Sequence, residues 1–166
     1  MKFVIIIILL ISITCFTKAQ ENDTTYKYWL TLGFMFYERD ASLNVSYNFS
    51  FAEHLFKVGY LLKGGMMGGL ANDGFSHKSI DVSIGDRWQS EWFQSSLFVG
   101  PAFVFGEKKN VVGNRENYYT TGIETELQLL FRIANEIGIG LGLYGNLNFQ
   151  KSYSGFNINF TIGNGK

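Results

Sequence analysis

Cysteine and proline are almost absent from this chain of 166 residues, which contains one of each. The single cysteine, Cys15, lies in an apolar N-terminal stretch, so no disulfide can form within the chain and the rest of it has no thiol chemistry. The formal net charge is zero, which gives a nucleic-acid partner no electrostatic support. The apolar run at 3–11 is shorter than the roughly 20 residues of a membrane-spanning helix, and no later segment approaches that length.

The N-terminus has the three parts of a secretory signal peptide. Met1-Lys2 supply positive charge, residues 3–11 form an apolar centre, and Ala19 is a small residue at the expected cleavage position. We therefore predict a signal peptide at 1–19 that is cleaved on export. Lipid attachment at Cys15 is an alternative that the sequence leaves open.

Aromatic residues are abundant, since Phe, Tyr and Trp make up 17% of the chain, more than a soluble domain of this size usually buries. They fall in segments where apolar and polar residues alternate, most clearly at 43–51 (LNVSYNFSF). Successive side chains of a β-strand point to opposite faces, so this run has one apolar face and one face of amides and hydroxyls. Eight such segments predict strands at 27–37, 42–52, 54–63, 77–86, 91–105, 118–133, 136–149 and 153–163.

Charged residues partition between the two faces of these strands. We find no Asp, Glu, Lys or Arg on the apolar faces, whereas the polar faces carry Lys57, Lys63, Asp81, Glu124, Glu126 and Arg132. Arg or Lys on the lipid face of a membrane barrel costs about 2–4 kcal/mol at the bilayer midplane. The partition therefore predicts a transmembrane barrel with its apolar face toward lipid and its charges inside.

The predicted connections alternate in length. Short turns follow the second, fourth and sixth strands, and the two longest connections, 64–76 and 106–117, follow the third and fifth. Bacterial barrels place short turns in the periplasm and longer loops outside the cell. We therefore expect the N-terminus in the periplasm, the two long loops outside, and aromatic residues gathered at both rims of the barrel.

In strand number, face pattern and loop alternation across residues 26–163, the chain resembles the small eight-stranded outer-membrane β-barrel proteins. The resemblance implies a short N-terminal segment at 20–26 and, at 27–163, an all-β, eight-stranded antiparallel up-and-down transmembrane β-barrel in a bacterial outer membrane. It also implies contact with outer-membrane lipids and with the barrel assembly machinery. Two features depart from the family: the chain lacks a terminal aromatic residue, and Pro101 lies within the fifth strand. Proline cannot donate to the ladder, so we expect a bulge or a local break there.

Three residues form a candidate catalytic group. His77, Ser79 and Asp81 share one strand face, and a base, a hydroxyl and a carboxylate within reach of one another could make a hydrolase. Some outer-membrane barrels are lipid A deacylases with a His-x-Ser pair, but their serine is typically followed by Asn, where this chain has Ile80. We therefore favour ordinary polar residues that line the lumen.

The six charged residues of the polar faces form a second candidate site. An eight-stranded barrel is just wide enough to be filled by side chains, and buried charges must be paired. We predict a salt-bridge network that plugs the lumen, with additional hydrogen bonds from Tyr144 and from asparagines of the last two strands. Acid–base chemistry by paired carboxylates is the less favoured interpretation.

Other motifs carry weaker signals. The run 140–145 matches a dinucleotide fingerprint, but that motif requires a strand that turns into a helix, and here the strand pattern continues. We expect no cofactor, and no metal-ligand spacing is present. In the second long loop, Lys108, Lys109 and Arg115 could meet anionic lipopolysaccharide.

The sequence thus favours an integral outer-membrane barrel with a plugged lumen and a structural or surface-interaction role, and not an enzyme. Two alternatives stay open. One is a soluble secreted or periplasmic barrel that binds a small apolar ligand and has its faces inverted. The other is an outer-membrane hydrolase that modifies lipid A.

Overall fold

The computed structural model describes residues 27–37, 40–51, 54–63, 75–109, 114–134 and 136–164. The predicted signal peptide at 1–19, with Cys15, and the predicted segment at 20–26 lie outside these ranges. Among the residues described, no helix has the length and apolar character needed to cross a membrane.

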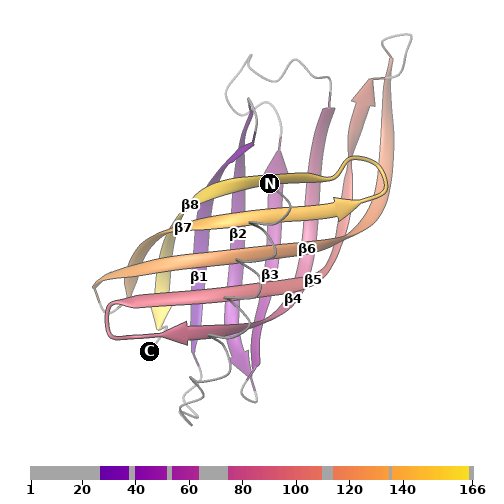
Figure 1. The fold of residues 1–166 in the computed structure, drawn as a ribbon. Coiled ribbons are helices and arrows are strands. Elements are labelled where there is room, and N and C mark those ends of the chain that lie inside the picture. The colour runs from indigo at the N-terminus through magenta and orange to yellow at the C-terminus, as the bar shows by residue number, and fades with distance from the viewer. Residues whose placement is uncertain are drawn as a thin grey trace, which may run out of the picture.

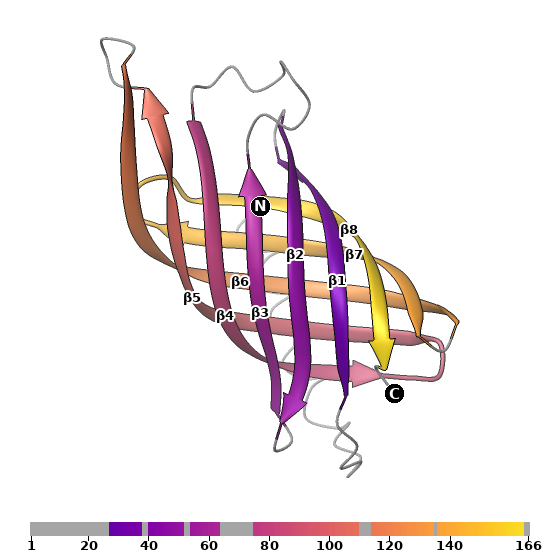
Figure 2. The same cartoon turned by 180° about the vertical axis from the view of Figure 1, so that it is seen from behind.

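The described chain forms strands in eight segments: β1 (Tyr28–Tyr37), β2 (Asp40–Phe51), β3 (His54–Lys63), β4 (Phe75–Gln89), β5 (Phe93–Lys109), β6 (Arg115–Ala134), β7 (Ile137–Asn148) and β8 (Tyr153–Asn164). Each strand pairs antiparallel with the next one, and β8 pairs antiparallel with β1. The sheet therefore closes into a barrel, whose two sides are seen in Figures 1 and 2. This confirms the predicted all-β, eight-stranded antiparallel barrel.

The two ends of the barrel differ. At one end, called here the turn end, short segments connect β2 to β3, β4 to β5 and β6 to β7, and the opposite end is called the loop end. The β5–β6 ladder continues to Lys109 opposite Arg115, whereas β6 begins to pair with β7 only at Gly122. The β5–β6 hairpin therefore rises beyond the other strands at the loop end (Figure 1, upper right).

This hairpin corrects one prediction. The sequence predicted a long loop at 106–117, but residues 106–109 belong to β5 and residues 115–117 belong to β6. The alternating pattern weakens there because the hairpin has charged residues on both faces. The other predicted loop, 64–76, loses Phe75 and Ser76 to β4, and the remainder lies outside the described residues.

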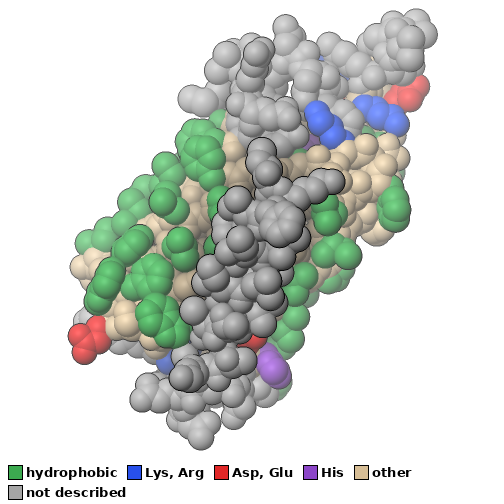
Figure 3. Space-filling model, in the orientation of Figure 1, with side chains coloured by type: hydrophobic (Ala, Val, Ile, Leu, Met, Phe, Trp, Pro, Cys, Tyr) green, Lys and Arg blue, Asp and Glu red, His purple; other side chains and the backbone are tan. Residues whose placement is uncertain are grey.

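The apolar strand faces point outward, as predicted. On β1, Tyr28, Leu30, Leu32, Phe34 and Phe36 are each 39–50% exposed. The alternate positions on the same strand point inward and are buried. Figure 3 shows apolar side chains spread over the flank of the barrel, with the visible described charges toward its two ends.

The expectation that no charged residue lies on an apolar face is wrong at two positions. Lys78 and Asp86 are exposed and share the outward face of β4 with Ile80, Val82 and Ile84. Both lie toward the ends of the outward apolar face, Lys78 at the loop end and Asp86 at the turn end. The two charges therefore bracket an uncharged outward run.

Pro101 interrupts the pairing of β4 with β5 without producing a bulge. The β4–β5 register runs to Asp81 opposite Ala102 and resumes, unshifted, at Ile84 opposite Val99. Along these two described strands the ladder is therefore broken opposite Pro101 and its neighbour Gly100, where proline has no N–H to donate. On the other side of β5, Pro101 keeps its place opposite Ile123. A register shift lies between β6 and β7, near Ala134.

Aromatic side chains gather at both rims of the outer surface. At the turn end, Phe131 contacts Trp92 and Phe93, with ring centroids 5.9 and 5.2 Å apart. At the loop end, Phe36 stacks on Phe156 at 5.2 Å, and Phe103 stacks on Tyr119 at 6.3 Å. Rings at both ends of an apolar band are typical of membrane barrels.

Candidate functional site

The centre of the barrel is built around the buried ammonium group of Lys57. Its Nζ lies 2.6 Å from Glu124 Oε1, 2.7 Å from Glu126 Oε2 and 3.1 Å from Asp81 Oδ2. These side chains come from β3, β6 and β4, and each is at most 2% exposed. We call these four residues the lumen ion cluster. Strand alternation explains it, because every member occupies an inward position.

The carboxylates of the lumen ion cluster have further hydrogen-bond donors. Gln128 Nε2 and Asn157 Nδ2 donate to Glu126 Oε1 over 3.0 and 3.2 Å. The Tyr144 hydroxyl donates to Glu124 Oε2, and Ser83 Oγ donates to Asp81 Oδ2 over 3.2 Å. Such donors matter because the cluster sets one ammonium against three carboxylates in a place shielded from water.

Two apolar layers enclose the lumen ion cluster. Toward the loop end lies a layer formed by Met35, Leu61, Tyr144 and Tyr153. Toward the turn end lies a second layer, formed by Trp29, Leu55 and Phe98, with the Phe98 ring centroid 5.7 Å from Lys57 Nζ. Tyr144 was predicted to face inward, but the other residues of the two layers were missed because the inward face was equated with the polar face. Counting alternate positions along each strand would have identified them, because every second residue faces inward whatever its polarity.

Small residues make room for the polar side chains. A Cβ added to Gly59 would lie 2.2 Å from Asp81 Oδ1, and one added to Gly142 would lie 1.9 Å from Asn157 Oδ1. Both glycines face inward beside a member or partner of the lumen ion cluster. The glycines of the run 140–145 therefore lie within β7, where the strand continues and does not open a helix.

Replacing Gly59 by Ala tests this packing. The added methyl group is expected to push the Asp81 carboxylate away from Lys57 and to destabilise the protein by about 1–3 kcal/mol. Gly145→Ala is the matched control, because its Cβ would meet only Thr125 Oγ1, at 3.2 Å. Urea unfolding followed by tryptophan fluorescence measures both variants, and equal midpoints would contradict the expectation.

The structure brings together four of the six charged residues predicted to line the lumen. Arg132 lies near the turn end, where its guanidinium donates to Gln89 Oε1 over 3.3 Å. Lys63 is the last residue of β3, and its side chain lies outside the described part of the structure. Arg132 does not reach the lumen ion cluster because it lies six residues beyond Glu126 on the same strand, nearer the turn end.

The candidate catalytic residues His77, Ser79 and Asp81 all point into the lumen and are buried. The His77 ring lies 4.3 Å from the ring of Tyr153, whose hydroxyl donates to Ser79 Oγ over 3.4 Å. Asp81 pairs with Lys57. The three side chains are thus engaged with different neighbours, although they share one strand face as predicted. In the described part of the chain, no group of His, Cys, Asp and Glu is arranged to hold a metal ion.

The predicted asparagines differ in their hydrogen bonds, and the Asn159 side chain has no partner among the described residues. Asn157 reaches the lumen ion cluster, whereas Asn148 organises the connection from β7 to β8. Asn148 Oδ1 accepts hydrogen bonds from the backbone N–H groups of Gln150 and Lys151, and its Nδ2 donates to Asn146 Oδ1 over 2.8 Å.

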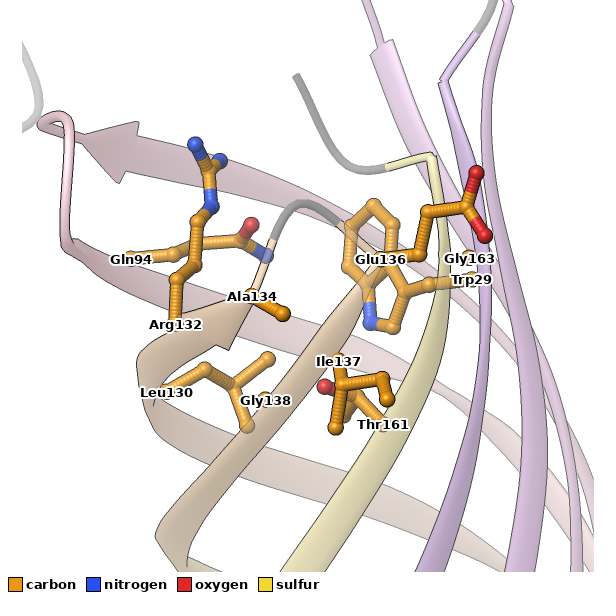
Figure 4. Close-up of a pocket in the computed structure, with 10 residues that line it drawn as sticks. All are labelled: Trp29, Gln94, Leu130, Arg132, Ala134, Glu136, Ile137, Gly138, Thr161 and Gly163. Carbon is orange, nitrogen blue, oxygen red and sulfur yellow. The ribbon is translucent and has the colours of Figure 1, made fainter.

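A small pocket opens at the turn end, with about 340 Å³ of empty volume when the space open to solvent is included. Figure 4 shows its lining, which comes from several strands and includes Trp29, Gln94, Leu130, Arg132 and Thr161. Apart from Arg132, none of these residues was a candidate in the sequence analysis.

Comparisons with known proteins place the fold. No protein-family model and no curated protein sequence matches this chain. Among solved structures, it is similar to the N-terminal β-barrel domain of Pseudomonas aeruginosa OprF, with a TM-score of 0.67 and 8% identity over 82% of this chain and 96% of that one. It is also similar to Neisserial surface protein A, with a TM-score of 0.60 and 9% identity over 82% and 94% of the two chains.

The attachment invasion locus protein Ail of Yersinia pestis is a third neighbour, with a TM-score of 0.56 and 11% identity over 83% of this chain and 96% of that one. These neighbours are eight-stranded outer-membrane β-barrels, and the chain has the same closed architecture. At such low identities the similarity establishes the fold.

Proposed function

We propose that this barrel, which shares its fold with eight-stranded outer-membrane proteins, is itself an integral protein of a bacterial outer membrane. The observation that carries the proposal is its outward face of large apolar side chains, such as Val82, which is 53% exposed. Soluble monomers rarely expose contiguous apolar patches larger than a few hundred Å². A closed barrel also satisfies its backbone hydrogen bonds internally, as lipid requires.

The height of the apolar band supports this location. Lys78 and Asp86 are eight positions apart on β4, which corresponds to about 26 Å along the strand and about 20 Å across a membrane at the usual strand tilt of about 40°. The apolar band of outer-membrane barrels is about 25 Å tall. Lys78 and Asp86 would therefore lie near the two membrane interfaces, where charge costs little.

We also propose that the lumen is closed and that the protein has a structural or surface-interaction role. The lumen ion cluster and its two apolar layers cross the interior with buried side chains, and a barrel of this size has little room beyond them. A soluble barrel that binds an apolar ligand is less favoured, because its interior would be apolar, and here it holds Lys57, Glu124 and Glu126.

The projecting β5–β6 hairpin supports a role at the cell surface. In its described strands Arg115 pairs with Glu107 at 3.3 Å, while Lys108 donates to Gln150 Oε1 at 3.4 Å. One neighbour is an attachment invasion locus protein that has been crystallised with a heparin analogue, sucrose octasulfate. We propose that this hairpin contacts polyanions, including lipopolysaccharide, through Lys108, Lys109 and Arg115. We also propose that the barrel assembly machinery inserts the protein into the membrane.

Fractionation tests the location. After expression in a Gram-negative host, the protein is expected in the membrane pellet, to require detergent for extraction, and to migrate faster on a gel when unheated than when boiled. The soluble alternative predicts recovery in the aqueous fraction without detergent and no effect of heating on migration.

The lipid A hydrolase is the remaining alternative. Replacing Ser79 by Ala is expected to leave the acyl chains of lipid A in the host unchanged relative to the unmodified protein, as measured by mass spectrometry. Loss of a deacylated lipid A species in the Ser79→Ala variant would contradict the proposed non-enzymatic role.

A further inference from the structure

The pocket at the turn end contains a buried donor group. Trp29 is 3% exposed, and its indole Nε1 has no hydrogen-bond partner among the described residues. Figure 4 shows this nitrogen directed toward Ile137 and Thr161, with Leu130 and Gly138 to one side, while the Arg132 guanidinium lies on the opposite side of the pocket. An indole N–H can only donate, so the pocket has a place for an acceptor.

Two cationic residues lie near this tryptophan. The guanidinium carbon of Arg87 lies 5.8 Å from the centre of the Trp29 ring, and Arg132 lines the pocket itself. The nearest carboxylate of the lining, on Glu136, lies on the far side of the Trp29 ring from Arg132 in Figure 4. Positive charge next to a buried donor favours an anion over a neutral acceptor.

We propose that the turn-end pocket binds a carboxylate group that enters from the turn end, with the Trp29 indole N–H as its hydrogen-bond donor and the Arg132 guanidinium as the positive charge on the opposite side of the pocket. A carboxylate accepts hydrogen bonds on both oxygens, so one oxygen can accept from the indole N–H while its charge is attracted by the guanidinium. The pocket is small enough that only the carboxylate and its nearest carbons would enter. This site is separate from the lumen ion cluster and does not depend on whether the lumen is closed.

The three tryptophans of the chain make a sharp test, because each gives one indole N–H signal in a nitrogen–proton correlation spectrum. The protein, labelled with ¹⁵N and held in detergent micelles at fixed ionic strength, is titrated with acetate, acetamide and inorganic phosphate. Acetate is expected to shift the Trp29 signal downfield and to saturate. The signals of Trp88 and Trp92 should stay in place, and acetamide should have no effect.

Two variants separate binding from folding. Arg132→Gln is expected to weaken acetate binding about tenfold, because the positive charge that attracts the carboxylate is lost. Lys78→Gln, which removes one exposed positive charge at the loop end, is the matched control and should leave the affinity unchanged. The proposal is overturned if acetate and acetamide shift Trp29 equally, if phosphate binds and acetate does not, or if Arg132→Gln binds acetate as tightly as the unmodified protein.

Discussion

Lys57→Met is expected to destabilise the folded barrel by about 3–5 kcal/mol, the cost typical of removing one partner from a buried ion pair. Methionine has nearly the length of lysine and fills the same space, so the loss would come from charge. Without the ammonium, Asp81, Glu124 and Glu126 remain buried and face one another without their shared partner. The midpoint of urea unfolding in lipid vesicles, followed by gel mobility, measures the loss.

A matched lysine and a combined variant complete this test. Lys108→Met removes a lysine that bonds to Gln150 in an exposed setting, and it is expected to cost less than about 1 kcal/mol. Adding Glu124→Gln and Glu126→Gln to Lys57→Met should restore much of the stability, because the uncompensated charges then disappear. If Lys57→Met lowers the stability no more than Lys108→Met does, the lumen ion cluster does not stabilise the folded barrel.

The second large effect is expected on the outer face. Val82→Arg places a charge near the middle of the apolar run that Lys78 and Asp86 bracket, and it should destabilise the membrane-inserted barrel by about 2–4 kcal/mol. Leu62→Arg is the matched control, because Leu62 lies opposite Lys78 near the loop end, where the same charge should cost about 0–1 kcal/mol.

Unfolding of both variants in vesicles distinguishes the membrane barrel from the soluble alternative. In water an exposed arginine at Val82 would be tolerated as well as one at Leu62, since neither would lose hydration. Equal unfolding midpoints for the two variants would therefore contradict the outer-membrane location.

Much of the fold could be predicted from the sequence because a barrel strand is a local pattern. Each segment alternates at every residue, so the inward position of Lys57, Asp81, Glu124 and Glu126 follows from parity alone. Closure follows from the same pattern, since lipid leaves no place for an unpaired strand edge.

Other features could not be predicted because they depend on register across strands. Which inward charges meet is decided by pairing: Lys57 pairs opposite Ser83 on β4, and Glu124 lies across the lumen on β6. Arg132 was placed in the network for the same reason: its inward direction follows from the strand pattern, but its position nearer the turn end than the lumen ion cluster does not. The apolar inward residues, such as Phe98, were missed because polarity was used in place of parity.

The outward apolar face is tested most directly by measuring whether its side chains are surrounded by lipid or by water in a bilayer. Single cysteines placed at Val58, Val82, Leu141 and Lys78 in a Cys15→Ser background would carry spin labels, with the barrel inserted in phosphatidylcholine vesicles. We predict that labels at the first three positions collide with oxygen dissolved in the lipid and are shielded from a water-soluble nickel chelate, while the label at Lys78 is reached by the chelate. Free access of the chelate to a label at Val82 would contradict the lipid-facing position of this surface.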